Sequence, residues 1–351
     1  MGEFVKLLYM HVLTICLLSF QFLGLCAELS QSVLAIIGGG PAGLTAAIYG
    51  ARAGIKTMVI VGDTPGGLLL GAGSVENMPG VSTQPGYKIM DTMREQAESF
   101  GVEFVYNAHV TSIEEQKTAE EAQKIESKQF CIVCAGEEEP ISKTIFADAI
   151  IIASGSTPKK LGVVGEDTYW GAGVTSCAVC DGMRVRGAGA IVVGGGDTAI
   201  EHVLHLQQYA RTTTLIVREG ALRASAHMQE KLKTLANVTI VYNSAIELID
   251  GDGVEMTHAL VKNIKTGVVT TIQAKGLFLA IGHVPNSSFC PSSVELLSDG
   301  TVLLPTRSQQ TTYPGIFAAG DVADNTYRQA CIAAGSGAQA ALEAIEYMRD
   351  K

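Results

Sequence analysis

The sequence lacks an excess of basic residues. Its 351 residues include 25 Lys and Arg against 35 Asp and Glu, which gives a formal net charge of −10 at pH 7. A chain that binds nucleic acid needs a basic face to neutralise phosphates, so this balance argues against such a partner. Charged residues are also scarce, at 17%, while hydrophobic residues reach 47%. A chain of this length and composition can bury large cores, most simply as two domains.

Two further absences narrow the class. The 39 glycines form no low-complexity tract and are scattered through tight turns, which suits an α/β enzyme. The cysteines outside CxxC pairs, including Cys290 and Cys331, are isolated in sequence and suggest no disulfide framework. No CxxC or His pairs stand at zinc-finger spacing from one another, so we predict no metal site.

Residues 7–27 contain no Asp, Glu, Lys or Arg and are rich in Leu, Phe, Val and Ile. Three interpretations stay open. The stretch is long enough to span a bilayer as an anchor, and it also reads as a secretory signal, with Gly24 and Cys26 at a cleavage site. The third interpretation is a wrongly included upstream start. We favour a targeting or anchoring segment, and we expect residues 1–32 to precede the folded unit.

The pair Cys177 and Cys180 is the strongest chemical signal. Two thiols separated by two residues can close a small disulfide ring, and a helix that begins there would lower the pKa of a thiol. Asp181 follows directly, and its carboxyl group is of the right kind to pass protons during thiol–disulfide exchange. A bare CxxC is also compatible with a structural or metal pair, but the flanking nucleotide motifs favour a redox pair.

Cys131 and Cys134 have the same spacing in a different context. They lie in the apolar, β-prone run 130–135, where residues three apart point to opposite faces. No neighbouring acid, base or helix start would activate either thiol. We therefore predict that both are free cysteines that pack as small hydrophobic side chains.

A dinucleotide-binding motif opens the folded unit. Residues 33–37 predict a strand, residues 44–52 predict a helix, and the turn between them contains GGGPAG. In this context Gly38 permits a tight turn, Gly40 lets a pyrophosphate approach the backbone, and Gly43 allows close helix–strand packing. The helix N-terminus would face the phosphates. The cofactor-binding residues assigned here are Gly38, Gly40, Pro41, Ala42 and Gly43.

Asp63 follows a second predicted strand at 57–61. An acid in this place often binds the ribose of a dinucleotide. It can equally be a turn residue before Pro65, and both interpretations stay open.

The motif occurs a second time. A strand is predicted at 190–193, a helix from 200 to about 209, and a further strand at 213–217. Two such units imply two dinucleotides, most commonly a flavin and a nicotinamide. The fold class is therefore α/β, with two Rossmann-like dinucleotide-binding domains. The residues assigned to the second site are Gly194, Gly196, Asp197, Thr198 and Ala199.

The C-terminal segment adds an apolar strand, predicted at 314–321, and a helix of small residues, predicted at 332–341. Asp321 ends the strand. A carboxylate there can accept hydrogen bonds from ligand hydroxyls, or it can cap the helix, and both interpretations stay open.

From residue 33 onward the motifs resemble, in their order, the low-molecular-weight, FAD-dependent thioredoxin reductases. Beyond the segments above, the resemblance includes Gly66-Gly67, VEN at 75–77 with Pro79-Gly80, ASG at 153–155, and AIGH at 280–283 with Pro285-Asn286. The related glutathione-reductase-like enzymes place a CxxxxC pair soon after the first glycine motif. No cysteine occurs here between Cys26 and Cys131, which argues against that branch.

The resemblance implies an NADPH domain at 159–286 inserted into a discontinuous FAD domain, 33–158 and 287–351, with hinges near Pro158 and Pro285. It also implies further cofactor contacts. For FAD these are Gly66, Gly67, Asn77, Gly155, Gly320, Asp321, Arg328, Gln329 and Ala330. For NADPH they are Arg218, Arg223, Ile281 and Gly282.

The resemblance further implies that hydride passes from NADPH to FAD and that the reduced flavin opens the Cys177–Cys180 disulfide. Cys180 would face the flavin, Cys177 would attack the disulfide of thioredoxin, and Asp181 would be the acid/base group. The NADPH domain carries both the dithiol and the nicotinamide site, so it must rotate to present each of them in turn to the flavin. A homodimer and a cytoplasmic location are also implied, although residues 7–27 point toward a membrane or secretory route.

Five residues depart from the family pattern. Leu68 stands where Gln is usual, Ala172 where Arg is common, and Met183-Arg184 where members that dock thioredoxin carry aromatic residues. Glu219 replaces the second Arg of a pair that binds the 2′-phosphate of NADPH. We therefore predict that NADPH is preferred over NADH by a smaller margin than usual.

Rival functions stay open. One is reduction of another disulfide partner, such as a peroxiredoxin or a glutaredoxin-like protein. Another is a dithiol oxidase, which keeps FAD and CxxC but needs no nicotinamide, and the intact second glycine motif argues against it. A non-catalytic flavin-binding scaffold is disfavoured by the segment CAVCDG at 177–182.

Overall fold

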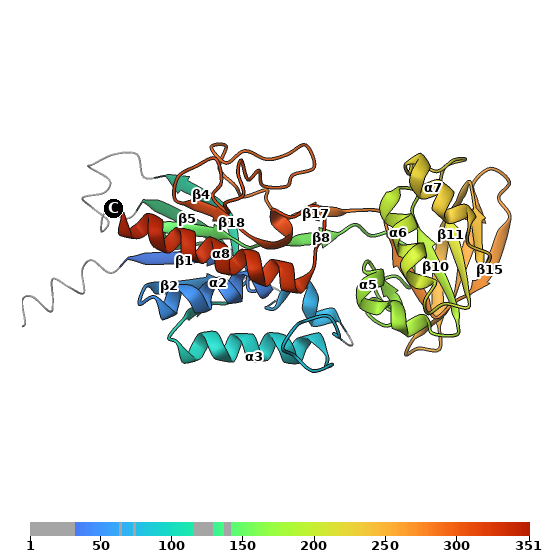
Figure 1. Cartoon of the computed structure of the whole chain (residues 1–351), viewed down its shortest axis with the longest axis horizontal. Helices are drawn as coiled ribbons and strands as arrows, with labels where there is room; N and C mark the ends of the chain where they lie inside the picture. Colours follow the sequence, from blue (N-terminus) through green and yellow to red (C-terminus); the bar gives the residue numbers. More distant parts are fainter. Residues whose placement is uncertain (1–31, 63–64, 73–74, 116–128, 137–141) are drawn as a thin grey trace, which may run out of the picture.

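The computed structural model describes residues 32–62, 65–72, 75–115, 129–136 and 142–351. They form two lobes joined by a pair of strands (Figure 1). The apolar stretch at 7–27 and Asp63 lie outside the described residues, so the predictions for them stay predictions. Within the ranges given above, no helix is both long and apolar enough to cross a membrane.

The first lobe is built on a parallel five-stranded sheet with the order β18-β7-β1-β2-β3. Its strands come from both ends of the folded sequence, since the C-terminal strand pairs with β7. The strands are β1 (Val33–Ile37), β2 (Lys56–Ile60), β3 (Glu103–Val105), β7 (Ala149–Ile152) and β18 (Ile316–Ala318). The strand β1 is buried on both faces, as expected for a parallel sheet covered on both sides.

Helices cover one face of this sheet and a second, antiparallel sheet covers the other. The blue helix α2 and the red helix α8 run side by side in Figure 1, although they lie at opposite ends of the folded sequence. The helices are α2 (Pro41–Arg52), α3 (Gly86–Ser99), α8 (Ala330–Arg349) and the 3₁₀ helices η1 (Gly67–Gly71) and η3 (Gly320–Val322). The antiparallel strands are β4 (Ala108–Glu115), β5 (Phe130–Gly136) and β6 (Ser142–Ala147).

The second lobe repeats the plan. Its parallel sheet has the order β12-β11-β10-β16-β9, with a three-stranded antiparallel sheet beside it. The parallel strands are β9 (Val174–Thr175), β10 (Gly189–Val193), β11 (Thr212–Ile216), β12 (Val238–Val241) and β16 (Gly276–Leu279). The other elements are α5 (Ala178–Asp181), η2 (Gly182–Val185), α6 (Asp197–Leu206), α7 (Ala226–Lys233), β13 (Ser244–Gly251), β14 (Met256–Asn263) and β15 (Val269–Gln273). The prediction of a two-unit α/β fold is confirmed.

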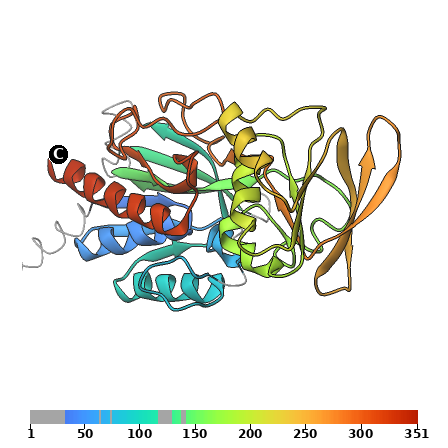
Figure 2. The same ribbon diagram turned by 45° about the vertical axis from the view of Figure 1, so that its right-hand side comes forward.

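The lobes are joined by β8 (Ser156–Pro158) and β17 (His283–Pro285), which pair in antiparallel orientation. Both strands are visible between the lobes in Figure 1, and Figure 2 shows the molecule turned by 45° so that the second lobe comes forward. Asn286 fastens the first-lobe end of this connection, because its Nδ2 donates to the Ser154 carbonyl oxygen at 2.9 Å and its own carbonyl accepts from Ser154 Oγ at 2.6 Å. The connection therefore consists of two short strands, and hydrogen bonds fix the end of it that lies in the first lobe.

The predicted elements are present, with shifted bounds. The helices predicted from 44 and from 200 begin about one turn earlier, at Pro41 and Asp197, because the glycine that precedes each of these residues, Gly40 or Gly196, is the N-cap. Proline is favoured at a first helical position, where no N–H is needed. The strand predicted at 314–321 was too long: β18 ends at Ala318, and Gly320 turns the chain with φ +74°. The helix predicted at 332–341 instead spans α8, Ala330–Arg349.

Cys131 and Cys134 are free, as predicted, and lie on β5 with Cys134 fully buried. Burial raises the pKa of both thiols. Neither is therefore prepared to react as a thiolate.

The contact between α2 and α8 gives a direct test of the fold. A Cβ built on Gly337 would lie 2.1 Å from the Ala42 carbonyl oxygen, whereas one on Gly335 of the same helix meets nothing within 4 Å. We expect Gly337→Ala to lower the free energy of unfolding by roughly 2 kcal/mol or more, because two backbones must separate. The matched control Gly335→Ala should be neutral or stabilising by about 0.5–1 kcal/mol. Denaturant titration measures both, and equal effects would contradict this packing.

Candidate active site

Cys177 and Cys180 form a disulfide, with their Cα atoms 5.3 Å apart. Cys177 is the N-cap of α5, and its Sγ accepts the Cys180 backbone N–H at 3.1 Å. The helix predicted here is thus present, but it is one turn of four residues before η2. The Cys180 residue is exposed and Cys177 is half-buried, so the disulfide is open to a reaction partner.

Asp181 lies half-buried at the end of this turn. Its Oδ2 accepts a hydrogen bond from Thr175 Oγ1 at 2.6 Å. Burial raises the pKa of Asp181, while the hydrogen bond from Thr175 and the charge of Arg184 oppose that rise. A carboxyl group whose pKa is moved toward neutrality beside a dithiol can both accept and donate protons.

The first glycine turn forms an open backbone cradle. A Cβ on Gly38 would lie 2.2 Å from the Ala153 carbonyl oxygen, and one on Gly43 would lie 1.9 Å from the Gly38 carbonyl oxygen. These two positions therefore need glycine for close packing. A Cβ on Gly40, in contrast, meets nothing within 4 Å, so open space lies above that backbone. Gly67 lies next to it, since a Cβ there would be 3.6 Å from the Gly40 Cα.

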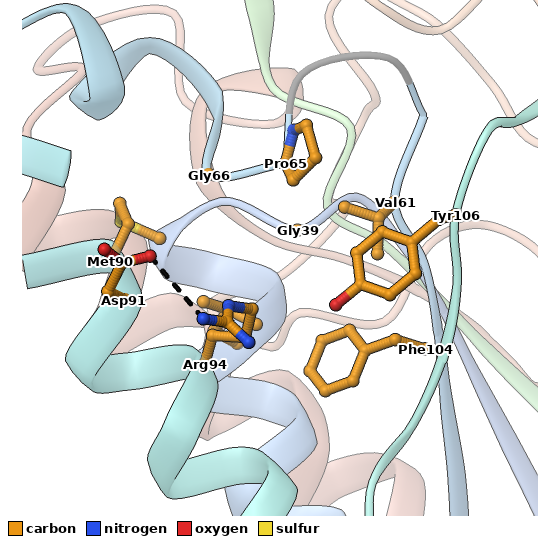
Figure 3. Close-up of a pocket in the computed structure, with 10 residues that line it drawn as sticks. Gly39, Val61, Pro65, Gly66, Met90, Asp91, Arg94, Phe104 and Tyr106 are labelled. Carbon is orange, nitrogen blue, oxygen red and sulfur yellow. Dashed lines mark ion pairs between the residues drawn. The ribbon is translucent and has the colours of Figure 1, made fainter.

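A pocket opens beside this cradle, at the carboxyl ends of β1, β2 and β3 (Figure 3). Phe104 and Tyr106 form one wall, with their ring centroids 5.9 Å apart and nearly parallel. Arg94 of α3 faces them and pairs with Asp91 at 3.6 Å. The carboxyl edge of such a sheet is the place where dinucleotides bind in folds of this kind. Sequence reasoning missed these residues, because nothing in their local pattern separates them from core side chains.

The C-terminal segment brings several predicted residues to the same region. Asn77 Nδ2 donates to Gln329 Oε1 at 3.1 Å, although 252 positions separate the two residues. Gln329 is the N-cap of α8, and Ala330 is its first residue. Gly320 packs against Ala42 of α2, because a Cβ on it would lie 3.0 Å from the Ala42 Cβ.

Asp321 and Arg328 form the charged part of this region. Burial raises the pKa of Asp321 to about 6, and the positive charge of Arg328 opposes that rise. Ser156 Oγ lies 3.4 Å from Asp321 Oδ2. The Arg328 Nε is buried and has no hydrogen-bond partner among the described residues. Asp321 itself is the second residue of η3, and Ser156 is the side-chain donor that lies within hydrogen-bond distance of its carboxylate.

The second glycine turn repeats the cradle. Gly194 has φ +151°, and a Cβ on it would lie 2.5 Å from the Ala280 carbonyl oxygen, whereas Gly196 faces open space. Thr198 is exposed and Ala199 is buried in the core of the lobe. Asp197 Oδ1 accepts the Ser225 backbone N–H at 2.6 Å, so this carboxylate holds the following loop.

The loop after β11 carries the predicted phosphate-binding arginines. The Arg223 N–H donates to the Gly195 carbonyl oxygen at 2.7 Å, which places Arg223 beside the glycine turn. Arg218 and Glu219 are both exposed, and Arg218 Nε lies 3.4 Å from Glu219 Oε1. Ile281 and Gly282 follow β16 at the same end of the sheet, and the Gly282 carbonyl accepts the Lys159 N–H. Glu219 thus forms an ion pair with Arg218, one of the two arginines predicted to bind the phosphate.

The two cradles and an exposed dithiol define a class of protein. A family model described as pyridine nucleotide-disulphide oxidoreductase matches residues 32–337. The chain belongs to the pyridine nucleotide-disulphide oxidoreductase family.

Within that family the similarity is to low-molecular-weight thioredoxin reductases, as the motifs predicted. The thioredoxin reductase of Spironucleus barkhanus is 39% identical over 315 residues, which cover 90% of this chain and 98% of the relative. The structure of the thioredoxin reductase from Giardia duodenalis is 40% identical, covers 91% of this chain and 100% of its own, and gives a TM-score of 0.80. That from Lactococcus lactis, in an FR conformation, is 34% identical, covers 92% and 100%, and gives 0.60. These names favour thioredoxin reductase over the rival functions.

The pKa of Asp321 gives a testable pH dependence for protein free of bound ligand. Its folded pKa, about 6, lies above the ordinary value of 3.8. The folded state therefore holds this proton more tightly, and stability from this group falls as pH rises from about 4 to 6. We expect the stability of Asp321→Asn relative to wild type to rise by roughly 1–3 kcal/mol between pH 4 and pH 7.5. Denaturant titrations at both pH values measure it, and a pH-independent difference would contradict the assignment.

Proposed function

We propose that this enzyme passes electrons from NADPH through FAD to the Cys177–Cys180 disulfide and from there to thioredoxin. The proposal is supported by an exposed disulfide that lies in the same lobe as one open glycine cradle. Two strands join this lobe to the other lobe, which contains the second open glycine cradle. The disulfide is the group that can exchange with a substrate disulfide, and the cradles suit two dinucleotides.

The first lobe has the features that FAD requires. The Gly40 backbone is open to a pyrophosphate, and Asp321 can accept hydrogen bonds from ribityl hydroxyls. The buried, unpaired Nε of Arg328 is a donor that a ligand would satisfy. When bound, FAD would supply two-electron transfer between a nicotinamide and a disulfide. The pocket of Phe104 and Tyr106 would hold its adenosine end.

The segments 33–158 and 287–351 would form the FAD domain, and 159–286 the NADPH domain. The narrow connection of β8 and β17 supports a rotation of one domain against the other. The two solved relatives also support it, because both cover over nine-tenths of this chain yet give TM-scores of 0.80 and 0.60. Such a rotation would present the nicotinamide site and the dithiol in turn.

Cys177 would attack the substrate and Cys180 would complete the exchange. The Cys177 residue is the N-cap of α5, where the backbone N–H of Cys180 already points to its sulfur at 3.1 Å. That N–H would stabilise a Cys177 thiolate after reduction. Asp181, next in sequence to Cys180, would take and return the protons.

We expect Cys180→Ser to retain FAD but to lose NADPH-dependent reduction of thioredoxin, since no disulfide can then close on Cys177. The flavin absorbance of the purified variant and its turnover with thioredoxin measure the two parts. Cys131→Ser is the matched control, because that thiol lies in β5 and forms no disulfide. Undiminished turnover by Cys180→Ser would refute the assignment.

The nicotinamide preference would depend on the loop after β11. A 2′-phosphate dianion suits the planar fork of arginine, and Arg218 and Arg223 are retained. Glu219 would repel the phosphate, and it also pairs with Arg218 at 3.4 Å. Both side chains are more than half exposed, so solvent weakens that pair. NADPH would remain preferred, but by a reduced margin.

We expect Glu219→Arg to raise the ratio of kcat/KM for NADPH over NADH by roughly ten- to a hundredfold, the value of one charge-assisted contact. The control Glu295→Arg makes the same charge change at an exposed site outside the loop and should leave the ratio unchanged. A wild-type ratio below one, or no increase in Glu219→Arg, would show that the loop does not act in this way.

Quaternary structure is proposed on the family resemblance alone. A homodimer formed through the FAD domains would give about twice the chain mass of 36.9 kDa in sedimentation equilibrium.

A further inference from the structure

Thr175 touches both functional ends of the dithiol turn. Its Oγ1 donates a hydrogen bond to Asp181 Oδ2 at 2.6 Å and accepts one from the Cys177 backbone N–H at 3.2 Å. Thr175 is also the last residue of β9, which pairs with β16 in the parallel sheet. The sheet therefore fixes the position of the Thr175 hydroxyl. Through its two hydrogen bonds this hydroxyl holds the Cys177 backbone and the Asp181 carboxylate against the edge of the sheet.

We infer that Thr175 is a positioning residue, whose hydroxyl orients the Asp181 carboxylate for proton transfer at the dithiol. The inference rests on the function proposed above. With Oδ2 fixed by the hydroxyl, the other carboxylate oxygen is the one that exchanges protons with sulfur. No sequence motif pointed to this threonine, because its role depends on where β9 ends.

The reaction that needs this carboxylate can be written in balance. The Cys177 thiolate attacks one sulfur of the substrate disulfide, the substrate S–S bond breaks, and the leaving thiolate takes up a proton. Cys180 then loses its proton and attacks Cys177 Sγ, which restores the enzyme disulfide and releases the second substrate thiolate. Two electrons and the Cys180 proton thereby pass from the dithiol to the substrate. The second substrate thiolate takes its proton from solvent, which received the proton that Cys177 lost when its thiolate formed. Asp181 must be ionised when Cys180 gives up its proton.

Arg184 of η2 supplies the nearby positive charge, but it is held elsewhere. Its Nη1 pairs with Glu255 Oε1 at 2.7 Å and its Nη2 donates to the Gly171 carbonyl oxygen at 3.0 Å. It thus favours the ionised carboxylate through space while Thr175 makes the direct bond.

Helix α6 covers the other side of the turn. A Cβ on Gly182, the residue after Asp181, would lie 3.2 Å from the rings of His205 and Tyr209. Burial lowers the pKa of His205, so this imidazole is neutral at neutral pH. The groups that favour ionised Asp181 are therefore Thr175 and Arg184.

Two substitutions separate the hydroxyl from the rest of the side chain. Thr175→Val keeps the branched shape that suits a strand but removes the hydrogen bond, whereas Thr175→Ser keeps the hydroxyl. Loss of a hydrogen bond to a charged group should raise the pH at which Asp181 ionises by about one unit, since the ionised form loses a stabilising contact. The serine variant should behave as wild type does.

The ionisation can be read without any substrate. In pH-difference infrared spectra of the oxidised, FAD-loaded enzyme, the carboxyl signal that is missing from Asp181→Asn reports Asp181 alone. We expect its midpoint to be about one pH unit higher in Thr175→Val than in wild type or Thr175→Ser. Coincident midpoints in all three proteins would overturn the inference. This readout does not depend on thioredoxin, so it separates the inference from the proposed function.

The second measurement is the rate at which thioredoxin reoxidises the NADPH-reduced enzyme, followed against pH. Because the ionised carboxylate is required, the acid limb of the profile should move up by about one pH unit in Thr175→Val. Thr175→Ser should restore the wild-type limb. A rate reduced equally at every pH in Thr175→Val would indicate a merely structural role and refute the inference. Failure of wild type itself to react with thioredoxin would instead refute the proposed function.

Discussion

The close approach of helix to strand at the two glycine turns is the constraint on which the rest of the structure depends. At Gly38, Gly43 and Gly194 a single added carbon would fall within 2.5 Å of a backbone oxygen. The helices α2 and α6 can therefore start directly at the carboxyl ends of β1 and β10, and each N-terminus is left facing open space at Gly40 or Gly196. The same packing requirement thus shapes both the cores and the proposed phosphate sites.

The position of the dithiol is determined by the parallel sheet and helix α6 of the second lobe. The edge strand β9 ends at Thr175, and the disulfide turn begins two residues later, between the sheet and α6. The dithiol and the proposed nicotinamide site are thereby carried on one lobe, while the proposed flavin site is on the other. The lobes are linked by two short strands and also meet near η1, where a Cβ on Gly171 would lie 3.2 Å from the Gly71 carbonyl oxygen. In the proposed mechanism, electron transfer between the flavin site and the other two sites would require one lobe to move about the two linking strands.

Much of the fold and the central chemistry could be predicted because the signals are local. Strand, glycine turn and helix follow one another within about twenty residues, and CxxC with its acid is contiguous. Contacts made across the sequence could not be predicted from local pattern. Thr175 reaches Asp181 only because β9 pairs with β16, and Phe104 and Tyr106 become a pocket wall only when β3 joins β2. The predicted ends of helices and strands were wrong where the backbone conformation of a glycine determines the end, as at Gly320 after β18.

The most direct test of the account is an anaerobic titration of the purified enzyme, followed by its visible spectrum. We expect a flavin spectrum that NADPH bleaches and that oxidised thioredoxin then restores, with one thioredoxin disulfide reduced for each NADPH consumed. A protein without flavin absorbance would contradict the account. So would a flavin that NADPH leaves oxidised, or one that NADPH bleaches and thioredoxin cannot restore.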